Sequence, residues 1–159
     1  MVEKGVVNAR FQIPHLKHIE YVLAAKMRCR KLYIGITNPD PSCVRESVND
    51  EIRSTPAANP LTYLERYEMI RGALEEFNVP LGDYEIVPFP IHRPEYITQY
   101  TPSDGVYYLG ICDGWDEEKL KILKGLDLKT EVLWRHSKEE CGVTGTWIRS
   151  CIATGQEWE

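Results

Sequence analysis

The chain has 159 residues and a mass of 18.4 kDa; 43% of its residues are hydrophobic and 27% are charged, which excludes disorder and suffices for one sizeable core. Its formal net charge of −5 argues against a non-specific nucleic-acid binder, although one local phosphate site stays open. No apolar stretch approaches the ~20 residues of a membrane span, and the charged start of the chain does not resemble a secretory signal.

The cysteine pattern favours a reducing compartment. The cysteines are odd in number and contain no Cys-x-x-Cys pair. We therefore expect neither a disulfide framework nor a zinc site, and we expect the protein to be cytoplasmic. The five cysteines are Cys29, Cys43, Cys112, Cys141 and Cys151.

The hydrophobic pattern alternates between strand and helix along the chain. Strands are predicted over 4–8, 31–37, 84–89, 105–112 and 130–135. Helices are predicted from Leu16, from a Thr62-x-x-Glu65 capping box, from about Asp116 to Lys124, and from Thr144 to Gly155. This order predicts an α/β fold, a Rossmann-like three-layer sandwich with a five-stranded parallel sheet, in a single domain over 1–159. The stretch 38–60 is too long for a plain connection and is either a short extra helix or a functional loop.

The segment after the first strand carries two histidines at the start of a helix. His15 and His18 are three residues apart, which places both imidazoles on one helix face. A helix N-terminus binds phosphate readily, and Arg10 and Lys17 add cations. Neither a Gly-x-Gly-x-x-Gly fingerprint nor a P-loop is present. On position alone, a second interpretation stays open, in which His15 is a helix-entry residue and His18 a solvated one.

Two further segments also precede or open helices. The residues of each suit either a phosphate site or an ordinary helix start. Thr144-Gly145-Thr146-Trp147-Ile148-Arg149 opens the last helix with hydroxyls, backbone N–H groups and an arginine. Asn59-Pro60-Leu61-Thr62-Tyr63-Leu64-Glu65-Arg66 precedes the second helix. Taken alone, the latter is equally typical of a loop, a capped helix and a surface arginine.

Together, the three segments resemble the motifs of the HxGH-type nucleotidyltransferases, and above all those of the archaeal-type nicotinamide-mononucleotide adenylyltransferases. The likeness extends from about Val6 to Gly155, with the motifs in the family's order. Three departures stand out: Ala9 replaces the first glycine of the family motif, Ile13 its proline, and Lys17 the glycine between the histidines. The segment 91–104 also lacks the tryptophan expected to stack on the pyridine ring.

The resemblance implies transfer of a nucleoside monophosphate, with ATP as the expected donor. The acceptor's phosphate oxygen attacks the α-phosphorus, pyrophosphate leaves, and positioning and charge stabilisation supply the catalysis. Mg²⁺ would bridge phosphate oxygens, and no protein metal ligand is expected. The implied catalytic residues are His15, His18 and Arg149; the implied nucleotide-binding residues are Arg10, Phe11, Lys17, Asp113, Thr144, Gly145 and Thr146; the implied acceptor-binding residues are Arg66, His92, Arg93 and Tyr96.

Several of these roles have a plain structural alternative. Asp113 also suits a tight turn and helix cap, and His92, Arg93 and Tyr96 suit an ordinary surface loop. Lys17 either reaches a phosphate or leans into solvent.

Three functions follow as hypotheses. The first is an adenylyltransferase that joins ATP to a phosphorylated acceptor such as nicotinamide mononucleotide. The second is a cytidylyltransferase, or another nucleotidyltransferase, for a small phosphate or phosphonate. The third is a catalytically weakened nucleotide-binding module. The partners expected are the nucleoside triphosphate and the small phosphorylated acceptor, without nucleic acid or membrane; self-assembly stays open.

Overall fold

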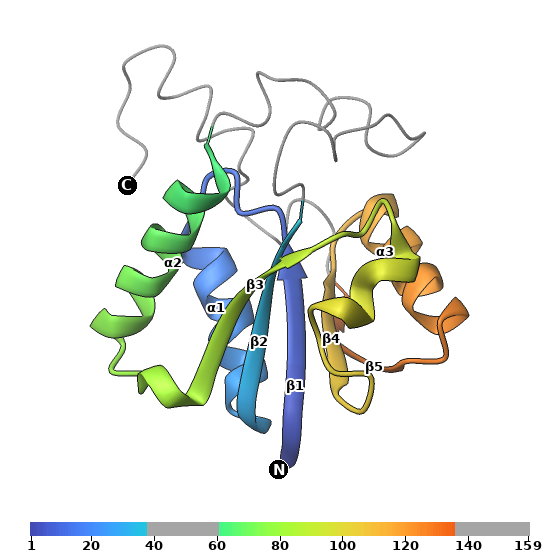
Figure 1. Cartoon of the computed structure of the whole chain (residues 1–159), viewed down its shortest axis with the longest axis horizontal. Helices are drawn as coiled ribbons and strands as arrows, with labels where there is room; N and C mark the ends of the chain where they lie inside the picture. Colours follow the sequence, from blue (N-terminus) through green and yellow to red (C-terminus); the bar gives the residue numbers. More distant parts are fainter. Residues whose placement is uncertain (38–60, 136–159) are drawn as a thin grey trace.

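A computed structural model describes residues 1–37 and 61–135 of the chain (Figure 1). Within them strands and helices alternate, and two short 3-10 helices precede and follow the third strand along the chain. The strands are β1 (Val2–Ala9), β2 (Cys29–Thr37), β3 (Tyr84–Phe89), β4 (Val106–Ile111) and β5 (Lys129–Arg135). The helices are α1 (Leu16–Lys26), α2 (Tyr63–Glu76), η4 (Leu81–Asp83), η5 (Pro94–Gln99) and α3 (Gly114–Gly125).

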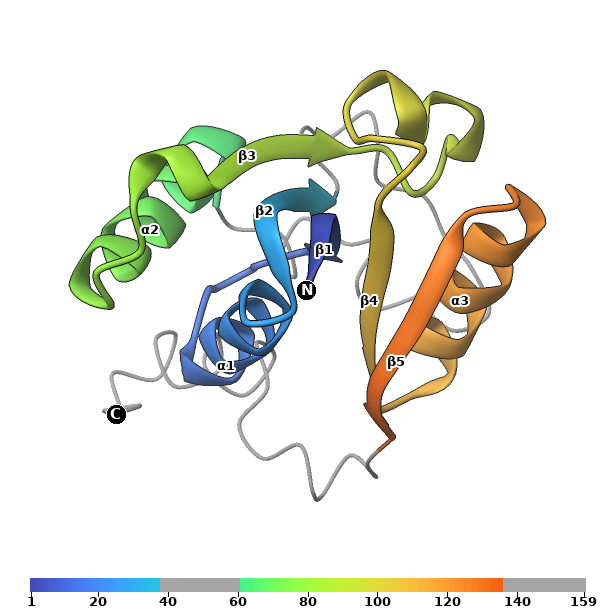
Figure 2. The same cartoon turned by 90° about the horizontal axis from the view of Figure 1, so that it is seen from below.

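The five strands form one parallel sheet in the order β3-β2-β1-β4-β5, which confirms the predicted fold class. From β1 the chain first builds outward through β2 and β3, and then returns to the other side of β1 for β4 and β5 (Figure 2). The strand order therefore reverses between β1 and β4. In open parallel sheets, ligands bind beyond the carboxyl ends of the strands at such a reversal.

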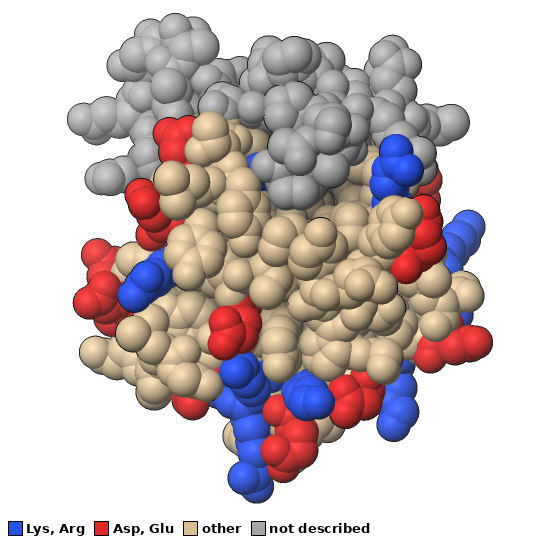
Figure 3. All heavy atoms as spheres, in the orientation of Figure 1, with Lys and Arg blue, Asp and Glu red and all other residues tan. Residues whose placement is uncertain are grey.

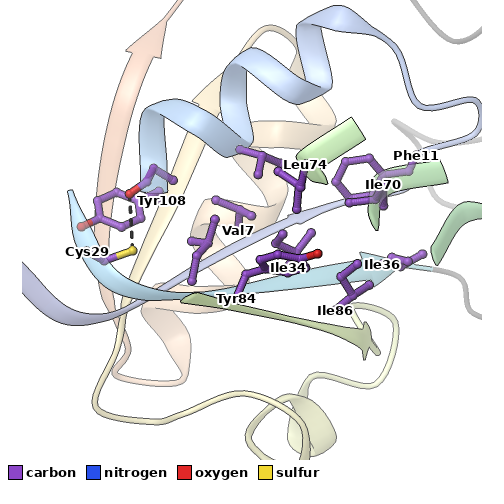
Figure 4. Packing of buried hydrophobic residues seen from close by; sticks show 13 residues of the cluster. Val7, Phe11, Cys29, Ile34, Ile36, Ile70, Leu74, Tyr84, Ile86 and Tyr108 are labelled. Carbon is purple, nitrogen blue, oxygen red and sulfur yellow. Dashed lines mark hydrogen bonds between the residues drawn. The ribbon is translucent and has the colours of Figure 1, made fainter. Parts of the chain in front are cut away.

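Helices cover both faces of the sheet, because alternate residues of each strand point to opposite faces. Val7 belongs to a core cluster with Val22 of α1 and with Ile70 and Leu74 of α2 (Figure 4). Its neighbour Val6 belongs to the second cluster, which includes Tyr107 of β4 and Leu123 of α3. The central strand is thus buried on both sides, as its unbroken apolar sequence predicts.

Capping residues determine where helices α2 and α3 begin. The Thr62 hydroxyl accepts from the Glu65 N–H at 3.1 Å, and the Glu65 carboxylate accepts from the Thr62 N–H at 3.0 Å, which confirms the predicted capping box. Helix α3 begins at Gly114, slightly earlier than predicted, because Asp113 is its N-cap. The η5 helix falls in a segment for which no element was predicted.

Strands β1 and β4 separate toward their carboxyl ends. Their pairing is recorded at Gly5–Val106 and Val6–Tyr107, whereas β1 pairs with β2 as far as Ala9. Beyond Val6 the hydroxyl of Tyr21 stands between the strands: it accepts from the Asn8 N–H at 3.4 Å and donates to the Tyr108 carbonyl. A side chain of α1 thus replaces a direct ladder hydrogen bond, and burial raises the pKa of that hydroxyl.

The two described cysteines differ in their covalent state. Cys29 is a free, buried thiol, but Cys112 is disulfide-bonded. Odd cysteine number and spacing do not reveal a pairing that folding brings together. Among the described residues, no helix has the length and apolar character needed to cross a membrane.

Candidate active site at the carboxyl edge of the sheet

The turn from β1 into α1 is anchored in the core by Phe11. This side chain is fully buried in the cluster under α1 and α2, and its backbone has a φ of 53°, a left-handed conformation that bulky residues seldom adopt. Its ring lies 5.0 Å from the ring of His18, centroid to centroid. The structure thus gives Phe11 a packing role beside the histidines; the nucleotide contact implied by the family resemblance stays a prediction.

The two histidines form one unit, as their spacing predicts. Their rings are stacked with centroids 3.9 Å apart and planes inclined by 23°. The Nδ1 atom of His18 accepts from the His15 backbone N–H at 3.3 Å. Because Nδ1 accepts, the proton of neutral His18 lies on Nε2, which makes that atom a hydrogen-bond donor.

His15 is uncharged at neutral pH. Burial, with a smaller contribution from the charge of Lys17, lowers the pKa of its imidazole to about 4. Its Nδ1 atom is buried and has no hydrogen-bond partner among the described residues. A neutral ring with unused hydrogen-bonding capacity at a helix N-terminus is suited to an incoming polar ligand.

Arg66 is buried and holds backbone carbonyls from three segments. Its NH1 group donates to the carbonyls of Arg10 at 3.0 Å and Thr37 at 2.8 Å, and its Nε donates to that of Thr62 at 3.1 Å. Only 1% of the residue is exposed, and burial lowers the pKa of the guanidinium to about 10, so it remains charged at neutral pH. Arg66 therefore joins the ends of β1 and β2 to the start of α2, a structural role that its sequence position did not indicate.

Gln12 makes a second connection between the same segments. Its side-chain amide donates to the Leu61 carbonyl at 2.8 Å and accepts from the Leu61 N–H at 2.9 Å. This two-way contact holds the turn that carries His15 against the entry of α2. Sequence reasoning assigned Gln12 no role, although a glutamine within the histidine motif was the available signal.

The other predicted residues of this edge lie at the start of α3 and in the segment around η5. The Asp113 carboxylate accepts from the Asp116 N–H at 2.9 Å, so the helix-cap interpretation of Asp113 is confirmed. His92 stacks on Trp115 with centroids 5.6 Å apart, whereas Arg93 and Tyr96 are exposed on η5 or at its start. The contacts of these residues with an acceptor stay predictions.

Lys17 points along the exposed side of α1. Its Nζ lies 3.4 Å from Glu20 Oε2, and both side chains are about half exposed, at 48% and 52%. A phosphate contact by Lys17 would require this pair to open, which costs only about 0.2–0.5 kcal/mol for such neighbours on a helix.

The predicted residues of the last motif, Thr144, Gly145, Thr146 and Arg149, lie outside the described residues. Residues 1–37 and 61–135 contain no group of three or more His, Cys, Asp or Glu side chains placed to hold a metal ion. The described part of the site thus offers no cluster for Mg²⁺, which stays an expected companion of the triphosphate.

A five-stranded parallel sheet whose strand order reverses beside β1, followed by a helix with stacked histidines at its start, defines the class: a Rossmann-like α/β domain. No protein-family model matches the chain. It is 45% identical over 155 residues to a phosphonoformate cytidylyltransferase of Streptomyces viridochromogenes, covering 98% of this chain and 83% of that protein. It is 25% identical over 162 residues to a nicotinamide-nucleotide adenylyltransferase of Saccharolobus solfataricus, covering 99% and 83%.

Solved structures agree on the fold. A bifunctional NMN adenylyltransferase/ADP ribose pyrophosphatase from Francisella tularensis matches with a TM-score of 0.69 at 14% identity; the match covers 98% of this chain and 43% of that one. The lipopolysaccharide core biosynthesis protein from Thermoplasma volcanium matches with a TM-score of 0.53 at 17% identity, over 86% and 98% of the two chains.

The chain belongs to the nucleotidyltransferase family that includes the Streptomyces cytidylyltransferase. The expected superfamily is therefore confirmed. The likeness to the adenylyltransferase is the weaker of the two curated ones, at 25% against 45% identity, which corrects the expected placement beside that branch. The sequence feature that keeps the cytidylyltransferase hypothesis open is the segment 91–104, which lacks the tryptophan expected in the adenylyltransferases.

Proposed function

We propose that the protein transfers the cytidylyl group of CTP to a small phosphonate or phosphate acceptor and releases pyrophosphate. The observation that carries this proposal is the 45% identity, over 98% of the chain, to the phosphonoformate cytidylyltransferase. The nicotinamide adenylyl transfer suggested by the motifs has weaker support, because the corresponding relative is 25% identical.

In the proposed reaction, an anionic oxygen of the acceptor attacks the α-phosphorus of CTP. A new P–O bond forms, and the bond from the α-phosphorus to the oxygen that bridges to the β-phosphate breaks. Pyrophosphate leaves with that electron pair. The nucleophile is already ionised, so no side chain has to remove a proton, and catalysis rests on alignment and on donors to the developing charge.

The described residues suit this task. The Nε2–H of His18 donates to a phosphate oxygen, and its orientation is fixed by the contact of Nδ1 with the His15 N–H. His15 adds a neutral ring and the N-terminus of α1 adds its dipole. Mg²⁺, carried on the phosphate oxygens, would supply further charge neutralisation. The acceptor binds beyond the carboxyl ends of the strands, with His92, Arg93 and Tyr96 as proposed contacts.

The decisive experiment measures pyrophosphate release with each of the four ribonucleoside triphosphates against phosphonoformate, small phosphate esters and nicotinamide mononucleotide. We expect CTP with a phosphonate or small phosphate to exceed every other pair by at least tenfold. Preferential turnover of ATP with nicotinamide mononucleotide would contradict the proposal. Binding of nucleotides without any turnover would instead support the weakened module.

A further inference from the structure

Asn8 is the one polar side chain in the buried run of the central strand. It follows Val6 and Val7 and is 3% exposed. Asparagine is disfavoured in strands, and the other buried positions of β1 are apolar or glycine. Its side-chain oxygen Oδ1 is buried and has no hydrogen-bond partner among the described residues. An orphaned buried oxygen costs roughly the desolvation of that group, so this residue requires an explanation.

The position of Asn8 suggests one. It is the second residue after the last recorded pairing of β1 with β4, and its N–H is the group that the Tyr21 hydroxyl accepts from across the widening gap. By strand alternation its side chain shares the face of Val6, toward α3. Asn8 thus lies where the strand order reverses between β1 and β4, the place at which ligands bind in such sheets.

The neighbouring strand offers Asn8 no donor. In register with Asn8 on β2 is Gly35, and a Cβ there would lie 2.6 Å from the Phe89 ring, so an aromatic ring fills the space beside it. A partner for Oδ1 must therefore come from the side of β4, whose recorded pairing with β1 ends at Val6. At neutral pH the phosphate oxygens of a nucleotide accept hydrogen bonds, whereas sugar hydroxyls and base amines donate them.

From these observations we infer that Asn8 is a nucleoside-recognising residue, whose Oδ1 accepts a hydrogen bond from a ribose hydroxyl or from the exocyclic amine of the base. The inference rests on the proposed function for the identity of the nucleotide. It adds a contact with the nucleoside half of the triphosphate to the phosphate contacts of the histidines. The unpartnered Oδ1 lowers the folding stability of the free enzyme, and in return this oxygen is available to accept a hydrogen bond when the nucleotide binds.

The test uses Asn8→Leu, which has a similar shape and no polar atom, with Asn8→Ala as a second variant. Tyr84→Phe is the matched control, because the Tyr84 hydroxyl is another buried oxygen without a partner but belongs to the start of β3, at the opposite edge. Calorimetric titrations use CTP, the other three triphosphates and inorganic tripolyphosphate, and melting temperatures are measured without ligand.

We expect Asn8→Leu to melt at the same temperature as the wild type or about 2–4 °C higher, since it removes an unsatisfied group. The same variant should bind CTP roughly five- to tenfold more weakly while binding tripolyphosphate unchanged. Tyr84→Phe should also keep or raise the melting temperature, with CTP binding unaltered. Unchanged CTP affinity in both Asn8 variants would overturn the inference, and so would a lower melting temperature with equal losses for CTP and tripolyphosphate.

The donor is identified with 2′-deoxy-CTP, 3′-deoxy-CTP and a pyrimidinone triphosphate that lacks the 4-amino group. The analogue without the relevant donor should bind the wild type as weakly as CTP binds Asn8→Leu, and should lose nothing further in the variant. The contact would be refuted if, for all three analogues, the loss caused by the missing group simply added to the loss caused by Asn8→Leu. If the wild type prefers another triphosphate and the Asn8 effect follows that nucleotide, the cytidylyl proposal fails while the role of Asn8 stands.

Discussion

The two edges of the sheet are held together by different kinds of contact. At the amino edge, charged side chains pair in the open: Lys4 with Asp104 at 3.2 Å, and Arg30 with Glu3 at 3.2 Å. Figure 3 shows the two signs of charge mixed along the lower edge of that view. At the carboxyl edge, the guanidinium of Arg66 is buried and donates to backbone carbonyls.

This difference indicates what each edge is for. Exposed ion pairs at the amino edge contribute little to folding stability, about 0–1 kcal/mol each, and their charged groups stay in contact with water. The buried contacts of Arg66 and Gln12 fix the backbone on either side of the histidine turn. Of the three buried side-chain atoms that have no hydrogen-bond partner within residues 1–37 and 61–135, two belong to the carboxyl edge, on Asn8 and His15. Its described backbone is thus tied by buried hydrogen bonds while two side-chain atoms lack a partner, a combination that suits a preorganised binding site.

The largest expected effect is at His18. Replacing it by alanine should lower turnover by roughly 10²–10³, as loss of one preorganised donor does. His18→Asn places an acceptor near the former Nδ1 and should keep the contact with the His15 N–H while losing the Nε2 donor. We expect both variants to fold, with His18→Asn closer to the wild-type melting temperature, and both to be similarly slow in pyrophosphate release. An active His18→Asn enzyme would remove His18 from the mechanism.

The second prediction compares two arginines directly. Arg66→Met leaves carbonyls of three segments without their donor, and we expect a loss of about 3 kcal/mol or more in the free energy of unfolding. Arg30→Met, at a side chain that is 68% exposed, should lose less than about 1 kcal/mol. Urea unfolding of both variants measures the difference. Equal losses would mean that the two edges are not distinguished by burial.

The third prediction concerns Lys17, whose charge either contacts a bound phosphate or only pairs with Glu20 in solvent, as the charges of the amino edge do. If it reaches a phosphate after leaving Glu20, Lys17→Ala should weaken CTP binding more than tenfold, and the loss should shrink at high salt. Glu20→Gln, which releases the lysine, should then tighten binding by roughly twofold. Titrations of both variants at two salt concentrations decide the matter. Unchanged affinity in Lys17→Ala would assign this residue to the solvated surface.

The sheet was predicted well from the sequence, because the apolar runs and helix caps that define its elements are local sequence patterns. Five apolar runs separated by helical patterns require a parallel sheet, and the capping box at Thr62 fixed the start of α2. The η5 helix was not predicted, since a short 3-10 segment around Pro94 has no periodic signature.

The site was predicted less completely, because its contacts join residues far apart in the chain. The histidine pair follows from spacing alone. The donation by Arg66 to Arg10 spans 56 positions and the contact of Gln12 with Leu61 spans 49, and no local pattern records such partners. Asn8 was overlooked for another reason: a polar residue inside an apolar strand looks like tolerated variation until its burial is known.

The last prediction is a dependence of stability on pH centred on His15. Its pKa of about 4 in the folded protein lies below the ordinary value of 6.5, so between these pH values the unfolded chain binds more protons than the folded one. Stability from His15 is therefore complete above about pH 6.5 and is lost as the pH falls toward 4. Urea unfolding from pH 7 to 4.5 should show this decline in the wild type and a flatter one in His15→Asn, which cannot titrate. The imidazole resonances should show His15 titrating well below the ordinary histidine range, and Lys17→Ala should move that titration upward by removing the nearby charge. A His15 that titrates near 6.5 would mean that the carboxyl edge leaves this ring solvated like the charged groups of the amino edge, and the distinction between the two edges would lose its histidine.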